Sequence, residues 1–163
     1  DYQLKEGSYV FIPPGKKWEI VNLEQSNAKF HWVRKVFEKE VSLSVPEFFV
    51  INEKSVLDLE MPNDKDWKTK RFVDPSDLRH DMHLNIVSFE PGSSIPFPET
   101  HVMEHAIYII QGKGRYYLNG SWVDVEAGDF MSLRAFCPQA CIATGDESFR
   151  YLLYKNVNRH IRL

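Results

Sequence analysis

The stretch AIYIIQGKGRYYLNGSWVDVEAGDFMSL, residues 106–133, decides the fold class. Its aromatic and β-branched residues occur in four short runs, which Gly, Asn and Asp residues separate. Similar runs recur in the rest of the chain, at 8–12, 29–37, 48–51, 82–89 and 149–154. Short strands with turn signals about every ten residues are typical of an all-β sandwich or barrel. The sequence therefore predicts an all-β fold with little helix.

With 163 residues, the chain has room for one full domain and part of a second.

The composition argues against two classes of partner, nucleic acids and membranes. The formal net charge of −3, from 20 basic and 23 acidic residues, predicts no polyanion-binding surface, so we expect no nucleic-acid partner. No apolar run is long enough to cross a bilayer, so we expect no membrane partner either.

The cysteines indicate a reducing compartment. Cys137 and Cys141 lie four residues apart on one predicted strand, too far apart to bridge, so we expect both to be reduced. The polar N-terminal segment DYQLKEG lacks a signal-peptide pattern. We therefore expect a cytoplasmic protein if the source is bacterial, with a targeting segment ahead of this chain as the open alternative.

The domain organisation is predicted from an internal repeat. Gly7 and Trp18 are eleven residues apart, as are Gly128 and Gln139, and each pair is followed by an aromatic strand pattern. Such repetition indicates two copies of one β-unit. The charged segment 53–66 looks strand-poor and is expected to connect them. We predict an incomplete first unit over 1–52, a linker over 53–66 and a complete second unit over 67–163.

The segment ETHVMEH, residues 99–105, carries the chemistry. Glu99, His101 and His105 all have odd numbers, so an extended backbone would place their side chains on one face. A straight strand would hold them too far apart to share an ion, so a bend is expected between the two histidines. Gln139, in a later turn, is the polar candidate for a fourth ligand. The alternative is that both histidines are ordinary imidazoles.

The chemistry of these donors narrows the choice of ion. Two imidazole nitrogens, a carboxylate oxygen and an amide oxygen form a borderline-to-hard set without thiolate. Such a set favours Mn²⁺ or Fe²⁺, with positions open for water or substrate, over a closed tetrahedral zinc site. The weakly donating amide oxygen would leave the ion much of its Lewis acidity.

At these residues the sequence resembles a cupin. The first cupin motif contains a Gly, then His-x-His, then Glu four residues later, then another Gly. Here Gly92, Glu99, His101, His105 and Gly112 take those places, with one His and the Glu exchanged.

The second cupin motif places a His eleven residues after a Gly. Gly128 and Gln139 take those two places here, with Gln in the position of the His. In the front copy of this motif the metal position is Trp18, which cannot bind a metal. The resemblance therefore implies a bicupin whose N-terminal cupin is incomplete and metal-free.

The Glu-x-His-x-x-x-His set with a distant Gln resembles the (S)-ureidoglycine aminohydrolase family. The front PPG at 13–15 and the sequence KNVNR at 155–159 are also similar. The resemblance implies a Mn²⁺-dependent hydrolytic deamination of (S)-ureidoglycine to (S)-ureidoglycolate and ammonia, in purine and allantoin breakdown. It also implies a small-molecule ureide substrate and a homo-oligomer.

The resemblance assigns roles to seven residues. They are the metal ligands Glu99, His101, His105 and Gln139, the catalytic residues Glu99 and Lys155, and the substrate-binding residues Tyr116, Tyr151 and Lys155. From the residues alone, Lys155 would be a solvated lysine at a strand end, and the two tyrosines would be core aromatics.

Two other functions stay open. One is another metal-dependent cupin enzyme, a dioxygenase or an isomerase, although dioxygenases usually bind Fe²⁺ through more histidines and sugar-phosphate isomerases need more basic residues. The other is a non-enzymatic cupin that binds a small molecule and holds no tightly bound metal.

Overall fold

The computed structural model describes residues 1–61 and 64–156, and the strands dominate it. Within these ranges there is no α-helix, so the predicted all-β class is confirmed. The elements are β1 (Ser8–Phe11), β2 (Phe49–Asn52), the 3₁₀ turn η1 (Glu53–Ser55), β3 (Leu59–Met61), β4 (Asp64–Arg71), β5 (His83–Phe89), β6 (His105–Gln111), β7 (Lys113–Leu118), β8 (Ser121–Glu126), β9 (Phe130–Leu133), β10 (Gln139–Ala143) and β11 (Phe149–Lys155). In the described part of the chain, no helix has the length and apolar character that a membrane span requires.

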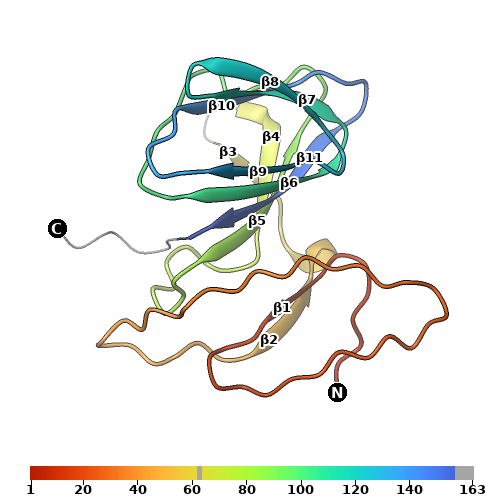
Figure 1. Ribbon diagram of the computed structural model, residues 1–163, viewed down its shortest axis with the longest axis vertical. Helices are drawn as coiled ribbons and strands as arrows, with labels where there is room; N and C mark the ends of the chain where they lie inside the picture. Colours follow the sequence, from red (N-terminus) through yellow and green to blue (C-terminus); the bar gives the residue numbers. More distant parts are fainter. Residues whose placement is uncertain (62–63, 157–163) are drawn as a thin grey trace.

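Two antiparallel sheets face each other and form a jelly-roll barrel, the upper body in Figure 1. The larger sheet has the order β3-β4-β5-β11-β6-β9, and the smaller one the order β10-β7-β8. In β6 and β11, buried residues alternate with half-buried or exposed ones, as a strand with one inward face requires. The inward residues form the core, with Phe89, Ile107, Tyr116, Cys141 and Phe149 almost fully buried.

The N-terminal segment covers the outer face of the larger sheet. β1 and β2 pair with each other and with no other strand of the described chain. Tyr9 of β1 stacks on Phe72, with ring centroids 4.8 Å apart, and Phe72 belongs to an outer apolar cluster with Leu84 and Ile86. The outward residues Leu84 and Ile86 of β5 are therefore buried as well, which explains the almost unbroken burial of this strand.

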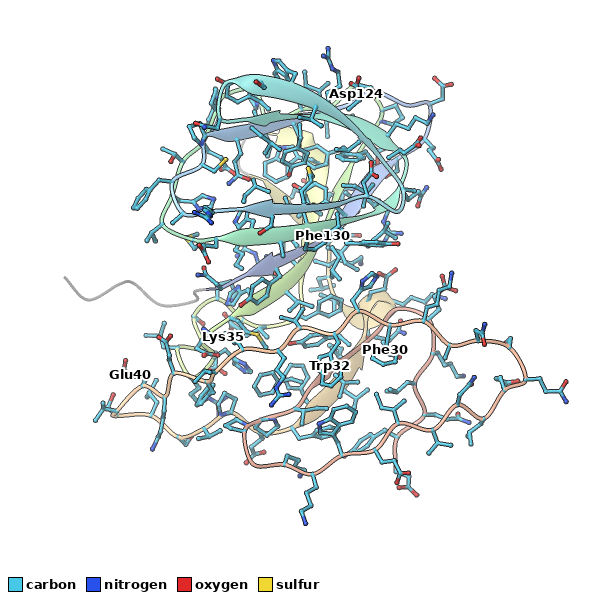
Figure 2. All side chains as sticks on the ribbon, in the orientation of Figure 1. Phe30, Trp32, Lys35, Glu40, Asp124 and Phe130 are labelled. Atoms are coloured by element: carbon cyan, nitrogen blue, oxygen red, sulfur yellow. The ribbon has the colours of Figure 1, made fainter. Side chains whose placement is uncertain are left out.

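The run KFHWVRKVF at 29–37 is predicted to be a strand, but it has no regular secondary structure. In the described part of the chain no strand pairs with it, so its backbone cannot join a ladder. Figure 2 labels Phe30, Trp32 and Lys35 on this segment, which runs below the barrel. Lys35 fixes it there through a 3.1 Å ion pair with the buried Asp81.

The segment 53–66 differs from the strand-poor linker that we expected. It contains η1 and β3, and β4 begins inside it at Asp64. β3 pairs with β4 and so extends the edge of the larger sheet. Charged residues are common on solvent-facing edge strands, which is why a charged sequence here does not exclude a strand.

Both cysteines, Cys137 and Cys141, are free, as expected.

The strand ends at one rim of the barrel bring together the polar inward residues. β4 ends at Arg71 and β11 at Lys155, while β5 begins at His83, β6 at His105 and β10 at Gln139. Neighbouring antiparallel strands run in opposite directions, so ends and starts meet at the same rim. Deeper positions on these strands hold apolar side chains. We call this rim the mouth of the barrel.

Candidate metal and substrate site

The loop before β6 brings Glu99 and His101 to the mouth. Glu99 and Gln139 form an antiparallel bridge, in which each backbone N–H donates to the carbonyl of the other at 2.8 and 2.9 Å. Farther on, the Phe136 N–H donates to the carbonyl of His101 at 2.7 Å. The chain bends at residue 102 and then enters β6 at His105. The bend expected between the two histidines is therefore present.

Gln139 joins the two histidine rings. Its Oε1 lies 3.2 Å from Nδ1 of His105, and its Nε2 lies 2.9 Å from Nε2 of His101. The two imidazole centroids are 4.5 Å apart. Gln139 and His105 are both buried, with 3% and 5% of their surface exposed. Three of the four predicted ligands thus meet at one point of the mouth.

The hydrogen bonds of the two rings assign their tautomers. Nδ1 of His101 lies 3.1 Å from the carbonyl oxygen of Met103, and Nδ1 of His105 lies beside Oε1 of Gln139. Both Nδ1 atoms face an acceptor and so carry the proton, which leaves a lone pair on each Nε2. Nε2 of His105 is buried and has no hydrogen-bond partner among the described residues. Nε2 of His101 accepts a hydrogen bond from Nε2 of Gln139, so an ion bound through both imidazole Nε2 atoms would take the place of that bond.

The charge state of His105 also suits a ligand. Its pKa is lowered to about 3, mainly by burial and further by electrostatic interaction with Lys155 and His101. The hydrogen bond that the ring donates to Gln139 acts in the opposite direction. The ring is therefore neutral near pH 7, and metal binding at this ring would require no proton to leave.

Glu99 stands apart from the two rings. In the part of the chain that the structure describes, no three His, Cys, Asp or Glu side chains gather closely enough to hold a metal ion. The bridge nevertheless places Glu99 directly opposite Gln139, so both side chains project from one face. Convergence of all four ligands stays a prediction.

The two predicted substrate tyrosines lie close enough to Glu99 for its charge to act on their hydroxyls. The rings of Tyr116 and Tyr151 meet edge to face, with centroids 6.0 Å apart. Burial raises the pKa of both hydroxyls well above the usual value, and the negative charge of Glu99 raises it further. Both tyrosines therefore keep their protons near neutral pH and can donate hydrogen bonds.

Cys141 is a neighbour of this site that the sequence did not indicate. Its thiol lies within hydrogen-bonding reach of both tyrosine hydroxyls, and burial raises its pKa to about 12. The sequence predicts only that this cysteine is reduced. A signal was available, since Cys141 follows Gln139 by two positions on β10 and so shares its face.

Lys155 projects into the mouth from the end of β11. It lies in register with His83 on one side and His105 on the other. Burial lowers its pKa, Arg71 lowers it further, and the carboxylate of Glu99 acts in the opposite direction. Lys155 is therefore an interior cation in electrostatic contact with Glu99, not the solvated lysine that its residue type alone suggests.

Three further residues of the mouth were missed. They are Arg71 on β4 and His83 and Asn85 on β5, all at inward positions. Arg71 is the cross-strand partner of Asn85, and His83 is the cross-strand partner of Lys155. The alternation in HLNIVSF was the available signal, because His83 and Asn85 share the face of the core residues Val87 and Phe89.

Two surface hollows lie away from the mouth of the barrel. Each has a volume of about 300 Å³, and they adjoin β1–β2 and the turn before His80, with no predicted site residue in their walls. Of the similar C-terminal sequence KNVNR, only Lys155 and Asn156 lie within the described residues.

Known proteins are similar to this chain in both sequence and fold. Residues 85–154 match the family model "Cupin domain". The (S)-ureidoglycine aminohydrolase of Escherichia coli (strain K12) is 32% identical over 170 residues, which cover 99% of this chain and 62% of that protein. The (S)-ureidoglycine aminohydrolase of Arabidopsis thaliana is 36% identical over 161 residues, which cover 97% of this chain and 51% of that protein.

A solved structure agrees. The crystal structure of a glyoxylate-induced protein from Pseudomonas aeruginosa superposes with a TM-score of 0.88 at 57% identity, covering 96% of this chain and 58% of that one. The chain thus spans between about half and three-fifths of these relatives.

The fold, the match of residues 85–154 to the cupin-domain model and the inward His and Gln donors define a cupin-domain protein. The chain is homologous over nearly its whole length to (S)-ureidoglycine aminohydrolases.

Proposed function

We propose that this chain carries the metal-dependent active site of a ureidoglycine aminohydrolase. The proposed reaction replaces the α-amino group of (S)-ureidoglycine by a hydroxyl group from water and yields (S)-ureidoglycolate and ammonia. The observation that supports it most directly is the contact of Gln139 with both His101 and His105 inside the barrel. The similarity to two aminohydrolases over nearly the whole chain supports the reaction type.

The proposed metal ligands are Glu99, His101, His105 and Gln139. When bound, a divalent ion, Mn²⁺ or Fe²⁺, would supply a Lewis acid that anchors an anionic substrate. Two imidazole nitrogens, one amide oxygen and one carboxylate suit that charge and hardness. Nothing in this set requires a thiolate.

Glu99 and Lys155 divide the proton transfers in this proposal. The carboxylate of Glu99 accepts a proton from the attacking water, and the ammonium group of Lys155 gives a proton to the departing amine. The mutual electrostatic influence of the two side chains supports this pairing. Since burial lowers the pKa of Lys155, its proton is easier to donate than that of a lysine in water.

Tyr116 and Tyr151 are proposed to hold the substrate. Both hydroxyls are buried and protonated, so they donate hydrogen bonds to substrate oxygens without competition from bulk water. The apolar core around them excludes water from the side of the barrel opposite the mouth.

The remaining organisation is also a proposal. Residues 1–52 would belong to a separate metal-free unit, since Trp18, in the position of a metal ligand, is an exposed aromatic residue. A homo-oligomer and a cytoplasmic location are expected for a bacterial source.

The test combines metal analysis with product analysis. The purified chain should contain close to one manganese or iron per chain and release ammonia from freshly prepared (S)-ureidoglycine. Consumption of dioxygen or turnover of a sugar phosphate, without ammonia release, would favour a dioxygenase or an isomerase. A protein that takes up no metal would favour the non-enzymatic cupin.

A further inference from the structure

Arg71 and Asn85 form the part of the mouth that lies away from the two histidines. They are direct cross-strand partners on β4 and β5. Trp67 identifies the inner face of β4, because it stacks on the core residue Phe89 with centroids 5.3 Å apart. Arg71 follows Trp67 by four positions and therefore shares that face, while the neighbouring Phe72 belongs to the outer cluster.

The charges in this region suit an anion. The guanidinium group of Arg71 is close enough to Lys155 to act on its ionisation, so two side-chain cations share the inner surface of β4 and β11. The carboxylate that acts on Lys155 belongs to Glu99. Glu99 pairs with β10 of the smaller sheet, whereas Lys155 lies on β11 of the larger sheet. A bound divalent cation would add to the positive charge, so the mouth as a whole attracts a small anionic molecule.

Asn85 provides the second, independent observation. Its side chain is only 4% exposed, and its Oδ1 atom has no hydrogen-bond partner among the described residues. Buried polar atoms in native proteins almost always have a partner, and an apolar side chain would fit beside Leu153 at a lower free-energy cost. Oδ1 of Asn85 can therefore accept a hydrogen bond from a donor other than the described residues.

We propose that Asn85 and Arg71 bind the ureido end of the substrate. Oδ1 of Asn85 accepts a hydrogen bond from the terminal NH₂ group, and the Arg71 guanidinium donates to the ureido carbonyl oxygen. A ureido group presents a donor beside an acceptor, and this pair of side chains presents the complementary acceptor and donor. The assignment rests on the proposed function, since it takes the substrate to be a ureide.

The spacing of the strands agrees with this arrangement. Asn85 on β5 is separated from His105 on β6 by one intervening strand, β11. Two strand spacings are roughly 10 Å. With both side chains directed inward, a small ligand can reach Asn85 with one end and the histidines and Lys155 with the other.

Binding of two inert analogues to the manganese-loaded protein tests the proposal. Hydantoate, N-carbamoylglycine, is the substrate without its α-amino group, and N-acetylglycine replaces the terminal NH₂ of hydantoate by a methyl group. Titration calorimetry should show that the parent binds hydantoate about ten times more tightly than N-acetylglycine, as expected for one satisfied buried hydrogen bond. A parent without this preference overturns the assignment.

Variants then locate the preference. Asn85→Leu should weaken hydantoate binding about tenfold and leave N-acetylglycine binding within twofold. Asn85→Asp, which keeps an acceptor oxygen, should retain the preference, and Asn85→Ala serves if the Leu variant does not fold. Arg71→Met should weaken both analogues, whereas Arg115→Met, at an exposed arginine paired with Asp124, should change neither. An equal loss of both analogues in Asn85→Leu would mean a structural role and overturn the proposal.

Ammonia release separates this inference from the proposed function. Discrimination between the analogues without deamination of ureidoglycine would support the ureido subsite and reject the reaction. Deamination by a protein whose Asn85→Leu variant keeps the full preference for hydantoate would support the reaction and reject the subsite.

Discussion

Lys155 lies directly opposite His105 across the β11–β6 pair, and both side chains project into the barrel. This register brings a cation to one edge of the candidate metal site and the Gln139 amide to the other. After burial, the charge of Lys155 is the largest influence that lowers the pKa of His105 to about 3. The charge of Lys155 thus adds to burial in favouring the neutral form of His105.

Manganese is expected to stabilise the folded chain. If the site binds the native state only, an ion at a hundred times its Kd adds about 2.7 kcal/mol to the free energy of unfolding. Thermal unfolding of metal-free protein with and without Mn²⁺ measures this directly. Magnesium, a harder ion that favours oxygen ligands, should give a smaller rise in Tm. Equal rises would argue against histidine ligation.

Removal of either oxygen ligand should weaken metal binding. Glu99→Ala and Gln139→Ala should each lower manganese content after dialysis and reduce kcat/KM for ureidoglycine, because each loses one donor. Glu104→Ala is the matched control, since this exposed carboxylate lies in the same segment but hydrogen-bonds Asn156 instead. Parent-like metal content in both ligand variants would contradict the assignment.

Loss of the Lys155 ammonium group should separate chemistry from metal binding. Lys155→Met should keep its manganese while kcat falls by about 10²–10⁴, the usual contribution of a general acid. Lys113→Met, at an exposed lysine of β7, should leave both quantities unchanged. Full activity in Lys155→Met would remove this residue from the mechanism.

Replacement of Gly112 by any residue with a side chain is predicted to destabilise the fold. Its φ is +77°, and an added Cβ would lie 2.6 Å from the backbone oxygen of Ser148. Gly120 also has a positive φ, but nothing lies within 4 Å of its added Cβ. Gly120→Ala should therefore cost about 1 kcal/mol of stability through the backbone alone, and Gly112→Ala about 3 kcal/mol or more. Urea unfolding checks both, and equal costs would contradict the steric argument.

The ion pair of Asp77 should contribute stability that depends on pH. Its carboxylate accepts two hydrogen bonds from Arg79, at 2.8 and 2.7 Å, and this lowers its pKa to about 2. The unfolded chain takes up this proton near pH 4 and the folded chain only near pH 2, so the stabilisation is present above pH 4 and is lost as the pH falls toward 2.

The expected size of this effect is modest. Because Arg79 is 43% exposed, solvent screens the pair, and Asp77→Asn should cost below about 1 kcal/mol at pH 7. Urea unfolding of parent and variant at pH 7 and at pH 3 should show a difference that shrinks at the lower pH. A constant difference would mean that the substitution acts through shape rather than charge.

Several features followed from the sequence alone. The alternation of apolar residues in segments such as 106–133 predicted the all-β class, because a half-buried strand needs one apolar face. Glu99, His101 and His105 stood out because they lie within seven residues of one another. Gln139 followed from its distance to Gly128. Local periodicity and local spacing were sufficient for these features.

The tertiary structure decided which distant residues share the mouth. Arg71, Asn85 and Lys155 are far apart in sequence and become neighbours through the registers of β4, β5 and β11. A shift of one residue in either register would turn these side chains to the outer face, and a single sequence contains no direct record of register. Pairing also decided that 29–37, despite its strand-like pattern, stays outside the sheets, since a strand exists only where a neighbour accepts its backbone hydrogen bonds.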